Sequence, residues 1–216
     1  MPRASLARIA PFAAFIALLA LQSLVDERWA RVLTLSRSFA AAALLAFFWR
    51  DYSELRGAPR TRRREWPLAI AVGVAVFIAW VTLDHGWMVI GEGRGFVPLD
   101  ESGRIDVPLA LARLAGLAIV VPVMEELFWR SFLMRWLASR DFLAIDPRRT
   151  TLAAIAISSA LFASEHSLWL AGFLAGLAYA WLYVRSGNLR VPVLSHATTN
   201  AILGLWILAT GRWSLW

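Results

Sequence analysis

The feature that most constrains this chain is a series of long apolar stretches separated by short charged segments. We place them at residues 9–25, 33–49, 67–90, 109–138, 150–166, 168–184 and 191–210. A helix needs about 20 mostly apolar residues to cross the hydrocarbon core of a bilayer. Within that core only helices and closed barrels can satisfy all their backbone hydrogen bonds. The sequence therefore predicts an all-α, polytopic membrane bundle of about seven transmembrane helices.

The overall composition leaves no room for a sizeable aqueous domain. Of the 216 residues, 59% are hydrophobic and only 17% are charged, whereas soluble domains contain about 25% charged residues. We find no internal repeat or domain linker, so we expect residues 1–216 to form a single membrane domain. The absence of cysteine excludes disulfides, thiolate metal sites and a cysteine nucleophile.

The charged segments between the apolar stretches predict a topology. Segments 50–66, 135–149 and 185–190 are basic, whereas segment 84–108 carries an excess of acidic residues. Basic loops stay in the cytoplasm, so seven spans place the N-terminus inside and the C-terminus outside. We expect an integral protein of the bacterial inner membrane. Since the apolar run of the first stretch is not followed by a convincing small-x-small cleavage site, we expect a retained helix rather than a signal peptide.

All 22 basic residues are arginine, and they give the chain a formal net charge of +7. A basic balance can indicate a nucleic-acid partner. Here, however, the arginines lie between apolar stretches rather than on one soluble face, so we expect no nucleic-acid binding. We expect membrane lipid to surround the bundle and to be its main partner.

The middle of stretch 109–138 contains three charged residues, Glu125, Glu126 and Arg130. A charged side chain at the centre of a spanning helix costs about 2.5–3.5 kcal/mol on insertion scales, so these groups should face the bundle interior or a wet cavity. Glu126 and Arg130 are four residues apart and can pair on one helix face. Glu125 points about 100° away and has no counter-charge on its own helix, which suits a proton acceptor. The alternative is an ion-pair cluster that only locks the bundle.

Two of the three histidines also lie in apolar stretches. His166 ends Phe162-Ala163-Ser164-Glu165-His166, and His196 lies four residues before Asn200. That spacing places His196 and Asn200 on one helix face, where their N–H groups could stabilise an oxyanion. A hydrogen-bonded core residue remains the alternative for His166, and hydrogen bonding between helices remains the alternative for the pair of His196 and Asn200. A carboxylate base, an imidazole and an oxyanion clamp are together the parts with which a hydrolase attacks an amide.

Three short motifs occur in order in these stretches: Glu-Glu-x-x-x-Arg at 125–130, Phe-x-x-x-His at 162–166 and His-x-x-x-Asn at 196–200. In this order and spacing they resemble the motifs of the CAAX-protease and bacteriocin-processing family, the Rce1-like intramembrane proteases. The resemblance covers a core of about residues 109–208. The short chain and the wording of the first motif also resemble the CAAX protease-related proteins associated with exosortase systems.

The resemblance implies a role for each motif residue. Glu125 would activate the attacking water, and His166 would assist or help to place it. His196 and Asn200 would stabilise the tetrahedral oxyanion, Glu126 and Arg130 would support the site, and Phe162 would pack around it. The expected activity is an endopeptidase that cleaves near the terminus of a membrane-associated or lipid-modified polypeptide.

A metal ion is a separate question. Glu125, His166 and His196 are residue types that can bind zinc, but the sequence has no His-Glu-x-x-His motif. The resemblance favours a metal-free, glutamate-activated water, so we expect no cofactor, with a divalent metal such as zinc as the alternative.

Two other functions fit parts of the pattern. Intramembrane Glu, Arg and His also occur in proton-coupled transporters, although we see no repeated halves or paired interrupted helices. A non-catalytic scaffold or immunity protein could keep the same fold.

One further motif concerns packing. Gly172 and Gly176 form Gly-x-x-x-Gly in an apolar stretch, and such small residues let helix backbones approach closely. We expect them to pack inside the bundle rather than to form a dimer.

Overall fold

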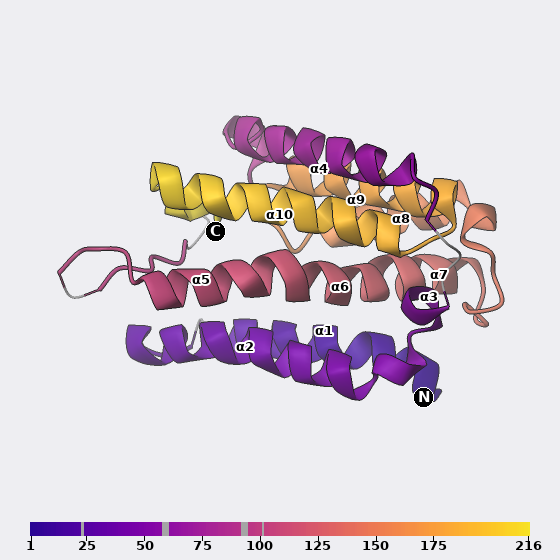
Figure 1. Ribbon diagram of the computed structural model, residues 1–216, viewed down its shortest axis with the longest axis horizontal. Helices are drawn as coiled ribbons and strands as arrows, with labels where there is room; N and C mark the ends of the chain where they lie inside the picture. Colours follow the sequence, from indigo (N-terminus) through magenta and orange to yellow (C-terminus); the bar gives the residue numbers. More distant parts are fainter. Residues whose placement is uncertain (23, 58–60, 92–94, 101) are drawn as a thin grey trace.

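The computed structural model describes residues 1–22, 24–57, 61–91, 95–100 and 102–216. Within these ranges the chain is a bundle of helices without a named strand (Figure 1), which confirms the predicted all-α class. The principal helices are α1 (Arg3–Gln22), α2 (Glu27–Phe47), α3 (Ser53–Arg56), α4 (Glu65–Thr82), α5 (Val107–Ala115), α6 (Val121–Glu125), α7 (Arg135–Ala138), α8 (Leu152–Ala163), α9 (Trp169–Ser186) and α10 (Arg190–Thr210).

Each of the seven predicted apolar stretches contains helix in the structure. Among the described residues, five helices are long and apolar enough to cross a membrane: Arg3–Gln22, Arg28–Phe47, Glu65–Thr82, Val107–Ala138 and Arg190–Thr210. Helix α8 is apolar but has only 12 residues, which is short for a full span. The chain is thus a helical membrane bundle, while the count of seven spans stays a prediction.

The long helix Val107–Ala138 lies at the centre of the bundle (Figure 1). Helices α1 and α2 pair with each other on one side of it, and α4, α8, α9 and α10 lie on the other side. Helix α10 pairs with α4, and α8 pairs with α9. The central helix therefore contacts both groups and places its polar residues between them.

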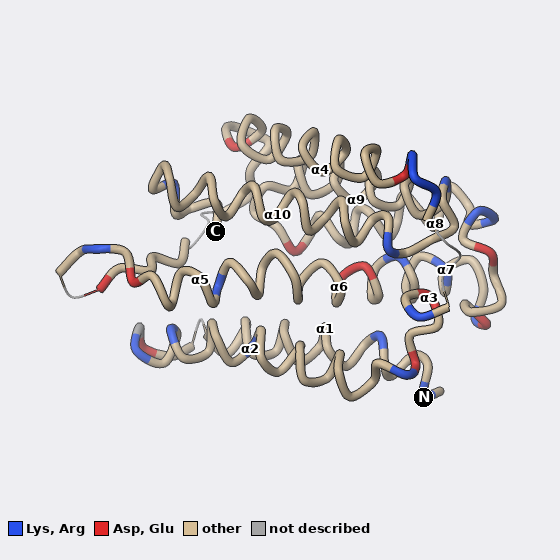
Figure 2. The backbone as a smooth tube through the Cα atoms, in the orientation of Figure 1, with Lys and Arg blue, Asp and Glu red and all other residues tan. Residues whose placement is uncertain are grey.

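The described parts of the basic segments lie at the end of the bundle that carries the N-terminus, and the described parts of the 84–108 segment lie at the opposite end (Figure 2). This grouping agrees with the loop pairing that the charge pattern predicts, although it does not say which end faces the cytoplasm. Four residues that contribute to the charge pattern lie outside the described residues: Arg60, Glu92, Arg94 and Glu101.

The central helix is not α-helical throughout. Two π-helical segments, η3 (Gly116–Val120) and η4 (Glu126–Met134), alternate with α5, α6 and α7. Pro122 lies at the start of α6, and because proline has no N–H it cannot complete the regular hydrogen-bond ladder. Such π-segments frequently mark functional sites. The sequence did not predict them, and Glu125 and Glu126 lie at the junction of α6 and η4.

A buried polar network joins α1, α3 and the central helix near the N-terminal end. Nε of Arg8 donates to Glu54 Oε1 over 3.0 Å and to Ser131 Oγ over 3.2 Å. Nη1 of Arg135 lies 3.5 Å from Glu54 Oε1 and 3.3 Å from Tyr183 Oη. The network therefore fixes the far end of η4, the segment that begins with Glu126.

Gly172 and Gly176 bring α9 against α8. A Cβ atom on Gly176 would lie 2.9 Å from Ser159 Cβ, and one on Gly172 would lie 3.3 Å from Ala163 Cα and 3.4 Å from His166 Cβ. The predicted packing role inside the bundle is confirmed. The same contact holds the turn that carries His166.

Candidate active site

A cavity of about 260 Å³ opens among α1, the central helix, the α8–α9 turn and α10. The side chains of Glu125, His166, His196 and Asn200 all line it, as does Phe162. These residues come from three separate regions of the sequence. The structure thus brings the predicted catalytic residues together at one place inside the bundle.

The two glutamates occupy different environments. Glu125 ends α6 and lines the cavity, whereas Glu126 begins η4 and is completely buried behind it. Nη1 of Arg130 lies 3.2 Å from Glu126 Oε1, which confirms the predicted i,i+4 ion pair. Within the described part of the chain, Oε2 of Glu125 is buried without a hydrogen-bond partner. The Glu125 carboxylate therefore faces the cavity, which Glu165 also lines, whereas Glu126 does not line it.

His196 connects the two carboxylates. Its Nδ1 lies 3.0 Å from Glu126 Oε1, and its Nε2 lies 4.0 Å from Glu125 Oε2. The imidazole also stacks on the Tyr179 ring, with centroids 4.8 Å apart and an interplanar angle of 18°. With Nδ1–H donating to Glu126, the ring orientation is fixed and Nε2 is directed toward Glu125.

His166 lies in the turn between α8 and α9. Its Nδ1 is 2.9 Å from the carbonyl oxygen of Phe162, and because a carbonyl only accepts, Nδ1 must carry the proton. In the neutral imidazole, Nε2 then keeps its lone pair and can accept a hydrogen bond from water. The ring packs edge-on against Trp80, at 5.1 Å between centroids.

Asn200 is tied to the central helix. Its Nδ2 donates to the carbonyl oxygen of Leu117 over 2.9 Å, and Leu117 lies in the π-helical segment η3. A primary amide has two N–H donors, so one hydrogen bond can orient the group while the other N–H serves a different acceptor.

Phe162 packs around the site as expected. It is 2% exposed, and its ring lies 4.5 Å from Cζ of Arg130 and 4.8 Å from the His166 centroid. It thereby contacts both Arg130 of the ion pair and His166 of the cavity lining.

Sequence reasoning assigned no role to three polar residues that also line the cavity: Glu165, Tyr179 and Thr199. Tyr179 Oη donates to Thr199 Oγ1 over 2.8 Å, and Thr199 Oγ1 donates to the carbonyl oxygen of Gly73 over 2.9 Å. Glu165 could have been found as a second carboxylate next to His166 in an apolar stretch. Tyr179 and Thr199 carry no comparable signal, because such residues are common in helix contacts.

The donor set does not form a ready metal site. Among the described residues, no three carboxylate or imidazole groups converge closely enough to hold a metal ion. The alternative set of Glu125, His166 and His196 therefore does not fit a preformed zinc site, which needs three protein ligands around one point.

The chain resembles one known protein family. Residues 107–202 match the family model described as type II CAAX prenyl endopeptidase Rce1-like. No curated protein and no solved structure matches the chain. The matched segment contains all three motifs, and the family is one of proteases; the exosortase-associated subgroup stays a prediction. Residues 107–202 are thus similar to the Rce1-like type II CAAX prenyl endopeptidases, and this similarity supports the family that the three motifs suggest.

Proposed function

We propose that this protein is an intramembrane endopeptidase that uses a glutamate-activated water to cleave near the terminus of a membrane-associated or lipid-modified polypeptide. The observation that carries the proposal is the cavity in which Glu125, His166, His196 and Asn200 meet. The similarity of residues 107–202 to the Rce1-like endopeptidases adds the expectation of peptide-bond hydrolysis.

The first step is attack by water on the scissile carbonyl carbon. The Glu125 carboxylate accepts a proton from the water, and His166 Nε2 accepts a hydrogen bond that helps to hold the water in place. The new C–O bond forms as the carbonyl π electrons move to oxygen, which gives a tetrahedral oxyanion. General-base catalysis of this kind contributes roughly 10²–10⁴-fold to the rate.

The second step is collapse of this intermediate. His196 enters this step as an imidazolium, so its Nε2–H and the second N–H of Asn200 both donate to the oxyanion. The Glu126 carboxylate accepts the Nδ1–H and balances the charge of the imidazolium, which keeps both protons throughout. The C–N bond then breaks, and the proton held by Glu125 passes to the leaving amine. The products are a carboxylic acid and an amine, so the water is fully consumed.

The test compares polypeptide termini in cells that carry the wild-type protein or Glu125→Gln at matched membrane levels. We expect a set of termini that disappears in the variant. Glu65→Gln is the matched control, because Glu65 lies at the start of α4 and does not line the cavity. Cells that carry this variant should contain the same polypeptide termini as cells with the wild-type protein.

Identical termini in wild type and Glu125→Gln, together with loss of a phenotype in the variant, would overturn the peptidase proposal in favour of a transport role. Cleavage by the purified enzyme, with and without a chelator, then tests the metal-free mechanism. We expect no effect of the chelator on the rate.

A further inference from the structure

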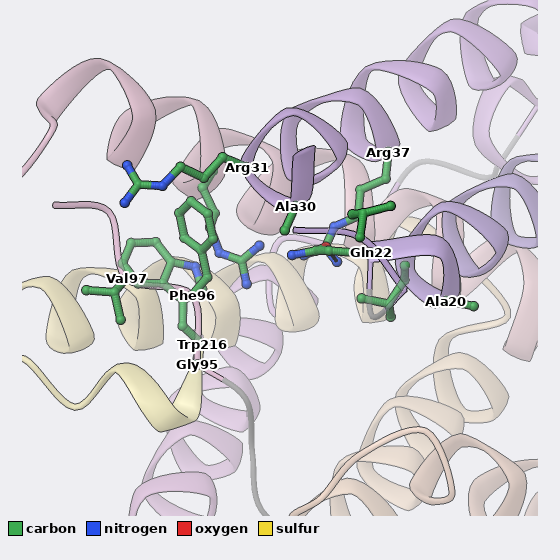
Figure 3. Close-up of a pocket in the computed structure, with 12 residues that line it drawn as sticks. Ala20, Gln22, Ala30, Arg31, Arg37, Gly95, Phe96, Val97 and Trp216 are labelled. Carbon is green, nitrogen blue, oxygen red and sulfur yellow. Dashed lines mark hydrogen bonds between the residues drawn. The ribbon is translucent and has the colours of Figure 1, made fainter. Parts of the chain in front are cut away.

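A second and larger cavity, of about 680 Å³, lies at the end of the bundle that carries the 84–108 segment. Figure 3 shows α1 and α2 on one side of it, with Gln22 next to Arg37, and the Gly95–Val97 segment beside Trp216 on another. Its size falls within the usual range of ligand pockets, about 300–1,000 Å³. None of the residues of the three motifs lines this cavity, and the proposed mechanism does not involve it.

Two arginines line this cavity from helices that are long and apolar enough to span the membrane: Arg37 in α2 and Arg113 in α5. Arg37 is 7% exposed, and Nε of each arginine is buried without a hydrogen-bond partner in the described part of the chain. Nη1 of Arg37 donates to the neutral Gln22 Oε1 over 3.0 Å. The guanidinium of Arg113 instead lies over two aromatic rings, 4.8 Å from the Phe96 centroid and 5.5 Å from that of Trp216.

These contacts do not neutralise the two charges. Among the described residues, neither Arg37 nor Arg113 forms a salt bridge with a carboxylate. Aromatic rings stabilise a cation only modestly, and buried charges are ordinarily paired. Two guanidiniums with free donors beside one cavity are therefore suited to receive an anion that comes from outside the chain.

The arginine cavity adjoins the candidate active site. Leu19, Arg37 and Trp216 line both cavities. A molecule that reaches Glu125 can therefore extend into the larger cavity and place an anionic group beside the arginines. Apolar residues such as Val25 and Val97 complete the lining, so the rest of that molecule should be apolar.

We propose that Arg37 and Arg113 form a subsite for the C-terminal carboxylate of the polypeptide substrate, which rests on the proposed peptidase function. The α-carboxylate is the one negative group that every unmodified polypeptide C-terminus carries, whatever its side chains. A guanidinium binds it through two parallel N–H···O hydrogen bonds. The subsite would set the direction in which the chain enters the cavity and favour cleavage close to its end.

A lipid phosphate is also negatively charged, but it would not be attached to the peptide that enters the cavity with Glu125. An anion held by Arg37 borders the cavity that contains Glu125, so the observations favour a group attached to the peptide being cleaved. The lipid is kept as an outcome of the test.

The experiment measures binding rather than cleavage, with purified Glu125→Gln protein in detergent. The probes are N-acetyl-Ala-Val-Leu with a free carboxylate and the same tripeptide as its C-terminal amide. A ligand that binds only the folded protein raises the melting temperature in a concentration-dependent manner. We expect the free acid to bind about tenfold or more tightly than the amide, because a charge-assisted hydrogen bond is lost in the amide.

Arg37→Gln and Arg113→Gln, each added to Glu125→Gln, should reduce binding of the acid to the level of the amide. The matched control is Arg28→Gln, since Arg28 is an exposed arginine of α2 outside the cavity; it should bind the acid normally. If the double variants do not fold, Arg37→Lys and Arg113→Lys keep the charge but not the bidentate geometry, and should show intermediate binding.

Equal binding of acid and amide, or binding of neither, would overturn the subsite. Stabilisation by inorganic phosphate or by phosphatidylglycerol vesicles, dependent on the two arginines and not reproduced by the acid, would overturn it in favour of a lipid headgroup. Because Glu125→Gln is used throughout, these results do not depend on catalysis. Failure of the subsite with intact Glu125-dependent cleavage would leave the peptidase proposal standing.

Discussion

At the scale of single residues, the candidate site combines one carboxylate held in an ion pair with another that faces the cavity. Glu126 is buried between Arg130 and Nδ1 of His196, so its negative charge is already used. Glu125 instead faces the cavity, with its Oε2 4.0 Å from Nε2 of His196. The sequence allowed this division to be predicted, because residues one apart on a helix point in different directions and only residues four apart can pair.

The role of Asn200 gives a prediction at this scale. Asn200→Ala should lower kcat by about 10²–10³-fold with little change in KM, because removal of one oxyanion donor affects the transition state far more than the bound substrate. The measurement is steady-state cleavage of a peptide identified from the comparison of termini. Thr210→Ala, near the exposed end of the same helix, is the control. An equal loss in both variants would indicate a structural effect.

At the scale of elements, the π-helical segments set the direction of the site residues. The carbonyl of Leu117 in η3 accepts the hydrogen bond from Asn200, and η4 begins at Glu126. Apolar periodicity predicted one long helix here, and the helix is present. It could not predict the change of helical pitch, since Pro122 was the only local signal and the packing of neighbouring helices decides the outcome.

Contact between α8 and α9 yields a second prediction. Gly176→Leu should destabilise the protein by at least about 1–3 kcal/mol, the usual cost of overpacking, because a Cβ at this position already lies 3.0 Å from Ser159 Cα. Thermal unfolding in detergent measures it. Leu174→Phe adds bulk to the exposed face of the same helix and should be tolerated. Normal stability of Gly176→Leu would contradict the close contact.

The network around Glu54 predicts a dependence on pH. Burial raises the pKa of Glu54, but hydrogen bonding and the charge of Arg8, with a further hydrogen bond from Ser131, bring it below the ordinary value of 4.5. A depressed folded-state pKa means that the ionised carboxylate stabilises the fold above pH 4.5 and that this contribution is lost as the pH falls through the lowered value.

Glu54→Gln should therefore have a lower melting temperature than the wild type at neutral pH, and the difference should shrink below about pH 4.5. Thermal unfolding of both proteins between pH 7 and pH 3 checks this expectation. Asp26→Asn at the start of α2 is a control for loss of a carboxylate outside the network. A difference that grows on acidification would contradict the ionised form of Glu54.

At the scale of the whole molecule, the bundle separates a basic end from the end that carries the 84–108 segment (Figure 2). Apolar length, helix order and the grouping of basic loops could all be predicted, because each follows from local composition. The network of Arg8, Glu54 and Arg135 could not, since its members are far apart in sequence and become partners only after the helices pack. The arginine cavity could not be predicted from the sequence for the same reason.

The lack of cysteine allows a direct test of topology. Arg63→Cys and Ser102→Cys each introduce a single exposed thiol, at opposite ends of the bundle. In intact spheroplasts an impermeant maleimide should label Ser102→Cys and not Arg63→Cys, because basic loops stay in the cytoplasm. Labelling of both after permeabilisation is the control. The reverse pattern would invert the predicted orientation.

The central claim is that Glu125 activates a water molecule for peptide hydrolysis, and purified protein in lipid vesicles tests it most directly. A peptide identified from the cellular termini is incubated with the wild-type protein or Glu125→Gln in water enriched in ¹⁸O. The masses of the products are then measured by mass spectrometry. We predict that the wild type yields a new C-terminal carboxylate carrying one solvent oxygen and that the variant is slowed by roughly 10²–10⁴-fold. Cleavage at the wild-type rate by a folded Glu125→Gln protein would contradict the account.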